Sequence, residues 1–269
     1  MKLILSVLFV LLLFVKPEKP LIDPNGTTIG TRINVPNGYK RMVLDSTSFG
    51  YYLRNFPLKQ HNSKVYQYDG KEKWNTGVYE AVLNIDVGDK DLQQCADAVI
   101  RLRAEYLYKR KLYDKMHFNF TNGFNAEYKK WAEGYRIKVT GNTTSWYKAA
   151  AADYTYTNFK KYMEQVFYYA GTLSLSKELK SVSIGDVQVG DVFIKGGSPG
   201  HAVIVVDVAV NAATDKRIFM VAQSYMPAQD IHILKNLEQP NISPWYDVST
   251  TDKVYTPEWT FDKNQLKRF

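Results

Sequence analysis

Cysteine is almost absent from this chain: Cys95 is the only one among 269 residues. No disulfide can form within the chain, which excludes a small disulfide-stapled fold. The sequence also lacks internal repeats, low-complexity tracts and any apolar run that reaches the ~20 residues of a membrane-spanning helix. With 45% hydrophobic and 23% charged residues, the composition is that of a globular protein.

The N-terminus carries a short apolar segment. Lys2 precedes Leu3–Val15, which is apolar except for Ser6. This length suits the core of a signal peptide and is short for a membrane span. No small-x-small cleavage site follows, since residues 16–19 read Lys-Pro-Glu-Lys. We therefore expect residues 1–19 to be a signal peptide or an uncleaved anchor that tethers the protein through residues 3–15, and the protein to be exported to the periplasm or cell envelope.

The chain has no strong motif for nucleic acid, metal or cofactor. Its formal charge is +8, but the basic residues are scattered, so we expect an anionic cell wall rather than a nucleic acid as the partner. No compact ligand motif such as His-x-x-x-His is present, and we expect no cofactor. A metal-dependent enzyme built from His201, His232 and nearby aspartates remains an alternative.

Hydrophobic periodicity predicts one α+β domain. Residues 20–45 are rich in Pro, Gly, Asn and Thr and predict an extended arm, while residues 46–269 predict a single domain with a helical, aromatic-rich insertion over about 112–180. Helices are expected at 47–56, 91–111 and 158–179, and strands at 78–87, 134–140, 192–195, 202–206, 218–223, 230–234 and 254–261.

The stretch over residues 190–207 is the most informative. Val192–Lys195 and Ala202–Val206 read as two strands separated by a Gly- and Pro-rich turn, and the second is a continuous β-branched run that predicts burial on both faces. His201 stands at the start of this second strand. Because catalytic side chains are often held at such loop-to-strand junctions, we expect His201 to be a catalytic base. The alternative is a half-buried structural histidine.

Cys95 lies near the start of the predicted helix 91–111, on its apolar stripe. Asp89 or Asp91 is expected to cap this helix. A thiol at a helix N-terminus has a lowered pKa and is a better nucleophile. A plain core cysteine fits the same stripe.

Gln223 is placed by hairpin arithmetic. If the hairpin that follows His201 is centred near Ala213, Gln223 opposes Val203 and its side chain points to the face of His201, one diagonal away. A thiol, an imidazole and a polar group that orients the ring are the parts of a cysteine hydrolase. Cys95, His201 and Gln223 follow one another in that order along the chain.

The segments Gly190-Asp-Val-Phe-Ile and Gly200-His-Ala-Val-Ile-Val-Val-Asp207 resemble the histidine strands of papain-like cell-wall hydrolases, the group of NlpC/P60 peptidases and CHAP amidases. The resemblance implies a papain-like antiparallel sheet packed on a cysteine-bearing helix, with Cys95 as nucleophile, His201 as base and Gln223 as orienting group. It implies peptidoglycan or a peptide as substrate. Asp207 and Asp230 remain alternatives for the third residue.

The whole chain also resembles an uncharacterised bacterial family of exported proteins, domain of unknown function 4846. The residues that carry this resemblance are 94–106, 169–175 and 222–232. It implies no activity. A catalytically inactive papain-like domain that binds glycans through the aromatic residues of 112–150 is therefore the main alternative to the hydrolase.

Overall fold

One long strand organises the structure. The computed structural model describes residues 19–249 and 251–269, and β9 (His201–Asn211) lies in the middle of its largest sheet. All residues from His201 to Ala209 are buried. This confirms the prediction from the β-branched run, since such a strand needs apolar cover on both faces. Alternate β9 residues do enter two different cores: Ala202 and Ile204 enter one, Val203 and Val205 the other.

The main sheet is antiparallel and runs in the order β2-β11-β10-β9-β8-β14-β7, with β1 pairing the far end of β9. The fold is therefore α+β, as predicted. Strand bounds in this sheet are β1 Tyr39–Arg41, β2 Tyr79–Val82, β7 Lys180–Ser181, β8 Val192–Lys195, β10 Arg217–Gln223, β11 His232–Leu234 and β14 Leu266–Arg268.

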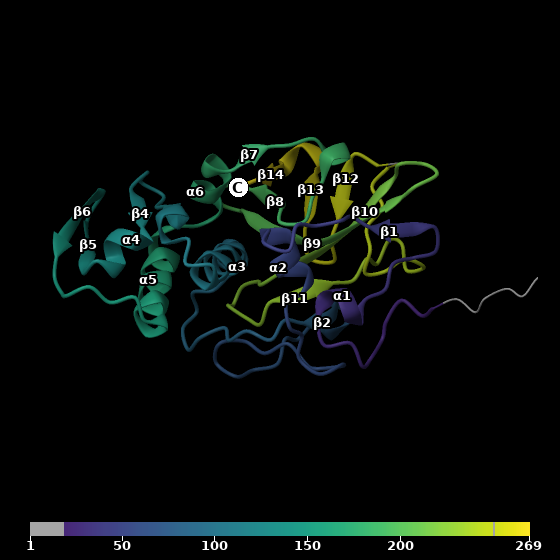
Figure 1. The fold of residues 1–269 in the computed structure, drawn as a ribbon, viewed down its shortest axis with the longest axis horizontal. Helices are drawn as coiled ribbons and strands as arrows, with labels where there is room; N and C mark the ends of the chain where they lie inside the picture. The colour runs from purple at the N-terminus through teal and green to yellow at the C-terminus, as the bar shows by residue number, and fades with distance from the viewer. Residues whose placement is uncertain (1–18, 250) are drawn as a thin grey trace, which may run out of the picture.

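Helix α3 (Cys95–Lys109) packs against β9 and lies between the main sheet and the inserted segment (Figure 1). Its buried residues Ala98, Val99 and Leu102 share a core with Ala202 and Ile204. The other helices in the described residues are α1 Ile29–Arg32, α2 Phe49–Arg54, α4 Tyr128–Ala132, α5 Tyr156–Tyr169 and α6 Thr172–Glu178.

The start of α3 differs from the expected one. The helix begins at Cys95 rather than at residue 91, and the residue before it, Gln94, is the N-cap. The Asp97 carboxylate accepts the Gln94 backbone N–H at 3.2 Å. Asp91 does not cap the helix, because its carboxylate accepts the backbone N–H of Ala228 at 2.7 Å instead. Cys95 is consequently the first residue of the helix.

The expected extended arm over residues 20–45 is wrong, because this segment is built into the domain. Ile29 and Ile33 are fully buried in the core that contains α3. Tyr39 to Arg41 form β1 and pair with residues 209–211 of β9. Short apolar stretches between Pro and Gly residues are enough to anchor this segment, because the main sheet supplies apolar contacts and a pairing strand.

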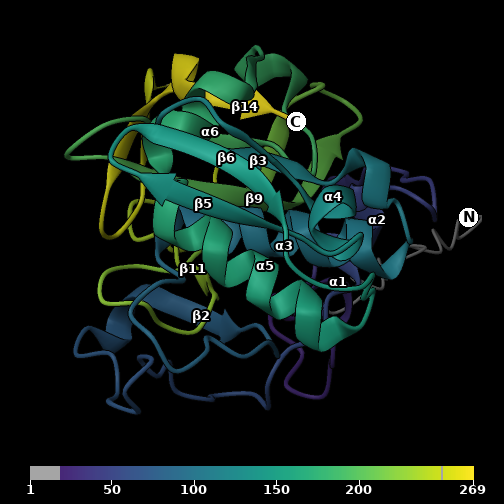
Figure 2. The ribbon, with the colours of Figure 1, turned by 90° about the vertical axis from the view of Figure 1, so that its left-hand side faces the viewer.

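Residues 112–180 are the segment in which the sequence predicts a helical, aromatic-rich insertion. Two hairpins, β3–β4 (His117–Asn119 and Asn125–Glu127) and β5–β6 (Tyr135–Thr140 and Thr143–Lys148), lie here with α4, α5 and α6. The strand expected at 134–140 is confirmed as β5, and the helix expected over 158–179 is divided into α5 and α6 at Gly171. Figure 2 shows α5 and the β5–β6 hairpin in front of α3 and β9.

The C-terminal region differs from the expected single strand over 254–261. It contains a hairpin of β12 (Lys253–Tyr255) and β13 (Thr260–Asp262), and then β14, which joins the main sheet beside β8. Residues 1–18 of the predicted N-terminal targeting segment lie outside the described residues. Within residues 19–249 and 251–269, each helix is too short or too polar to cross a bilayer.

Candidate functional site

The turn before β9 fixes where His201 enters the sheet. Gly197 has a φ of +115°, in the region that favours glycine. A Cβ on Gly200 would lie 2.4 Å from the carbonyl oxygen of Gly197, so only glycine fits at that position. His201 then pairs with Lys195 at the start of the strand. The loop-to-strand junction predicted for His201 is confirmed.

The structure brings His201 and Gln223 together. Beyond a β-bulge between Met220 and Val221, β10 pairs Ala222 with Ile204, in the register that the hairpin arithmetic predicted. Nearer the turn the pairing is one residue off that register. The His201 ring nitrogen Nε2 lies 2.7 Å from Gln223 Oε1. Both side chains are buried, with 2% and 0% of their surface exposed. The Gln223 amide is therefore the side chain that is hydrogen-bonded to the His201 ring.

The two alternative third residues lie elsewhere. Asp207 accepts hydrogen bonds from Arg41 at 2.6 Å and from Arg54 at 2.7 Å. Asp230 accepts the Lys59 ammonium at 2.7 Å. Neither carboxylate is hydrogen-bonded to His201. Asp207 and Asp230 each form ion pairs with other segments of the domain instead.

Cys95 reaches the backbone beside His201. The backbone N–H of Ala202, the residue after His201, is among the groups that lower the pKa of the Cys95 thiol. The thiol residue retains 8% exposure, more than His201 or Gln223. In the described part of the chain no hydrogen bond joins the thiol to the imidazole. The thiol therefore reaches the β9 backbone next to His201, at the end of the strand where the imidazole enters the sheet.

The expected low pKa of Cys95 is wrong. Burial, followed by the nearby Asp97 carboxylate, raises the pKa of the thiol to about 11, and the backbone N–H groups only partly oppose this. Burial also lowers the pKa of His201 to about 4, although the hydrogen bond to the Gln223 oxygen acts to raise it. At neutral pH the Cys95 thiol and the His201 imidazole are therefore both uncharged.

An aromatic shell surrounds the imidazole. The ring of Trp259 lies 5.3 Å from the His201 ring, that of Tyr225 lies 5.2 Å away, and Phe261 stacks at 5.9 Å. Trp259 and Phe261 belong to the C-terminal hairpin β12–β13. This shell is the source of the burial that depresses the pKa of His201.

Two charged residues behind Gln223 escaped the sequence analysis. Glu258 Oε2 accepts the Gln223 side-chain N–H at 2.7 Å, and Glu258 Oε1 accepts the Lys73 ammonium at 2.6 Å. The Lys73 side chain is only 2% exposed, which is rare for lysine. Lys73 lies in a segment without hydrophobic periodicity, and Glu258, expected within a strand over 254–261, lies instead in the turn between β12 and β13.

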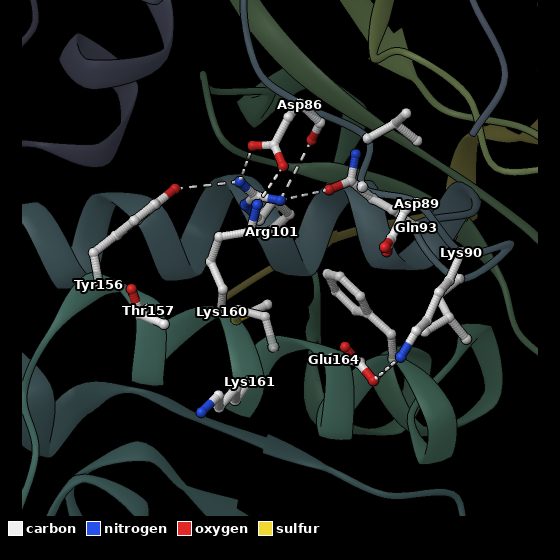
Figure 3. Close-up of a pocket in the computed structure, with 15 residues that line it drawn as sticks. Asp86, Asp89, Lys90, Gln93, Arg101, Tyr156, Thr157, Lys160, Lys161 and Glu164 are labelled. Atoms are coloured by element: carbon white, nitrogen blue, oxygen red, sulfur yellow. Dashed lines mark hydrogen bonds and ion pairs between the residues drawn. The ribbon is translucent and has the colours of Figure 1, made fainter. Parts of the chain in front are cut away.

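A cavity of about 340 Å³ lies beside the start of α3, between the 86–93 segment and α5 (Figure 3). Leu92, Met163 and Phe167 supply apolar wall, and Arg101 pairs with Asp86 at 3.0 Å on its rim. One hydrogen bond links the wall of the cavity to the strand end that carries Gln223. Its wall residue Gln93 accepts, at its backbone oxygen, the hydroxyl hydrogen of Ser224 at 2.9 Å, and Ser224 follows Gln223.

A family profile described as Domain of unknown function (4846) matches residues 29–268. The chain belongs to this family. No curated protein and no solved structure matches it. The match begins at Ile29, the first residue of α1, and so includes most of the segment 20–45 that packs into the domain.

The aromatic residues of this family member's insertion are mainly core. Phe118, Phe120 and Tyr128 are almost fully buried, and Trp131 is 5% exposed. Their rings pack on one another and on α5: the Tyr128 ring lies 5.6 Å from that of Phe159. The glycan wall that the alternative hypothesis requires is therefore not formed by these four residues.

Among the described residues no group of three or more His, Cys, Asp and Glu side chains is arranged to hold a metal ion. His232, which the metal hypothesis needed, is fully buried on β11 and its Nδ1 lies 2.8 Å from the Asp230 backbone oxygen. Burial lowers the pKa of His232 to about 3. His232 is a neutral core histidine.

Proposed function

We propose that this member of the 4846 family is a cysteine hydrolase of amide bonds with a papain-like arrangement of Cys95, His201 and Gln223. The observation that carries the proposal is the 2.7 Å contact between His201 Nε2 and Gln223 Oε1. It is joined by a cysteine at the first residue of α3, whose thiol interacts with the backbone N–H of Ala202, the residue after His201. A polar amide that orients an imidazole next to a thiol is what acyl transfer by cysteine requires.

The chemistry runs in two steps. The Cys95 sulfur attacks the carbonyl carbon of the substrate while the thiol proton passes to His201. The imidazolium then donates this proton to the amide nitrogen as the C–N bond breaks, which releases an amine and leaves a thioester on Cys95. In the second step His201 takes a proton from water, the resulting hydroxide attacks the thioester, and the proton returns to the sulfur with release of the carboxylic acid.

The charge state of the pair supports a general-base mechanism. With a thiol pKa of about 11 and an imidazole pKa of about 4, no thiolate–imidazolium pair is preformed at neutral pH. The proton therefore moves during the attack. The backbone N–H groups at the start of α3 point toward the thiol end of the site, where they favour negative charge on the carbonyl oxygen.

We further propose an exported enzyme that acts on peptidoglycan or peptides in the cell envelope. The support is the apolar segment 3–15 and the net charge of +8, which favours an anionic wall. The cavity lined by Gln93, two residues before Cys95, offers an apolar wall and charged side chains, which suits the side chains of a peptide.

Acylation of Cys95 tests the proposal without knowledge of the substrate. We expect the small activated ester p-nitrophenyl acetate to place one acetyl group on Cys95 at pH 7.5, detected by peptide mass spectrometry. Cys95→Ala should abolish this label, and His117→Ala, a variant of an exposed histidine, should leave it unchanged.

The inactive-domain alternative makes the opposite prediction. If Cys95 takes up no acetyl group until the protein is unfolded, the thiol is a core residue and the hydrolase proposal fails. Screening of amide substrates would then end, and binding of cell-wall fragments to the folded protein would become the property to measure.

A further inference from the structure

A chain of four buried polar side chains ends at the imidazole. The Lys73 ammonium donates to Glu258 Oε1 at 2.6 Å, and Gln223 Nε2 donates to Glu258 Oε2 at 2.7 Å. Gln223 Oε1 then lies 2.7 Å from His201 Nε2. Lys73 and Glu258 are 2% and 8% exposed. An ion pair so deeply buried is expensive in desolvation and is weak evidence for a purely stabilising role.

Each link of this chain has only one possible direction. A carboxylate accepts hydrogen bonds and cannot donate them. Glu258 therefore obliges Gln223 to present its NH₂ group, which turns Oε1 toward His201. An amide oxygen also only accepts, so His201 Nε2 must carry the ring proton. The neutral ring then has its lone pair on Nδ1.

We propose that Glu258, held by Lys73, is a positioning residue that fixes the tautomer of His201. The inference rests on the proposed function in one respect: the thiol proton can pass to the ring only at a nitrogen that lacks hydrogen, and this tautomer reserves Nδ1 for that purpose. Without the carboxylate, the Gln223 amide can rotate by half a turn and offer NH₂ to Nε2. The ring proton then moves to Nδ1, and the acceptor for the thiol is lost.

The position of Lys73 supports this role. Its ammonium lies 5.3 Å from the centre of the Tyr225 ring, and Tyr225 itself packs on His201. The Lys73 backbone N–H donates to the Val65 carbonyl at 2.9 Å, which anchors the segment that delivers the side chain. Its ammonium forms an ion pair with the Glu258 carboxylate, which accepts hydrogen bonds.

The tautomer can be read directly by ¹⁵N NMR of the full chain with labelled histidine rings, since the two neutral tautomers have different ring-nitrogen shifts. The His201 signals are assigned by their loss in His201→Asn. At pH 7 we expect the wild-type ring to carry its proton on Nε2. In Glu258→Gln, which keeps the shape of the side chain, we expect the proton to shift wholly or partly to Nδ1.

Two variants serve as controls. Glu258→Asp retains a carboxylate and should retain the Nε2 tautomer. Glu72→Gln changes an exposed glutamate, paired with Lys64, in the same way and should leave the His201 signals unmoved. If wild-type His201 carries its proton on Nδ1, or if Glu258→Gln leaves the tautomer unchanged, the inference is overturned.

This readout is independent of catalysis. The tautomer is measured in the resting protein, so an unreactive Cys95 would overturn the hydrolase proposal while the tautomer result still stood. If the hydrolase proposal and the tautomer inference both hold, Glu258→Gln should also slow acetylation of Cys95 by about tenfold or more. A triad imidazole in the wrong tautomer loses most of its activity as a base.

Discussion

Replacing His201 with alanine is expected to slow the acetylation of Cys95 by p-nitrophenyl acetate about 10²- to 10⁴-fold at pH 7.5, the range that a positioned general base contributes. The reason is the high pKa of the thiol, about 11. At pH 7.5 only a very small fraction of such a thiol ionises unaided, so attack depends on a base that takes the proton during the reaction. Rates follow from the time course of the acetylated peptide.

His117→Ala is the matched control, because His117 is 44% exposed and lies in the insertion, where it contacts Glu178 at 3.6 Å. Its acetylation rate should equal that of the wild type. Circular dichroism should show that His201→Ala remains folded. Equal rates in His201→Ala and wild type would mean that the thiol reacts without the imidazole, and the proposed pair would be wrong.

Arg54→Leu is expected to lower the free energy of unfolding by about 3 kcal/mol, as the loss of one partner of a buried ion pair does. The Asp207 side chain is fully buried and is held by Arg41 and Arg54. With Arg54 removed, one guanidinium must neutralise a carboxylate that water cannot reach. Arg54 also donates to the Met42 backbone oxygen at 2.7 Å, and this acceptor loses its partner. Urea denaturation measures the change.

Lys64→Leu provides the comparison. Lys64 pairs with Glu72 at a similar distance, 2.7 Å, but its side chain is 58% exposed. An exposed pair of this kind is worth less than about 1 kcal/mol. If the two variants destabilise the protein equally, burial does not set the strength of the Asp207 network. A loss of Cys95 acetylation in folded Arg54→Leu would argue that Asp207 has more than a structural role.

Local patterns predicted the parts of the site that lie on regular elements. The β-branched run after His201 requires cover on both faces, and the structure supplies it. The predicted hairpin centre gave the register at Gln223, but the strands start one residue off it at the turn, and a β-bulge between Met220 and Val221, which was not predicted, restores it. Strand alternation and hairpin geometry are short-range properties, so a single sequence contains them.

The pKa of Cys95 was predicted with the wrong sign because two effects compete. A helix N-terminus favours a negative charge by about 0.3–1 kcal/mol. The shift of the thiol pKa from 9.0 to about 11 corresponds to a penalty on the order of 3 kcal/mol. Desolvation therefore wins. Its size depends on how closely β9 and the neighbouring segments cover the thiol, which is a tertiary property that the helix sequence does not contain.

Lys73 and Glu258 could not be predicted for a similar reason. Each stands in an irregular segment, more than 100 residues from at least one of its partners in the buried chain of side chains. Nothing in the neighbouring sequence marks them as buried, because charged residues in loops are normally solvated. Only the packing of the C-terminal hairpin beside β9 brings them behind Gln223.

The pH dependence of Cys95 acetylation between pH 5 and pH 9 tests the central claim most directly. If neutral His201 takes the thiol proton, the rate rises through the imidazole pKa of about 4 and is then flat across this range. In His201→Ala the rate should instead rise tenfold per pH unit, because only the thiolate, with a pKa of about 11, can react. A wild-type rate that climbs tenfold per unit alongside the variant would contradict the pairing of Cys95 with His201.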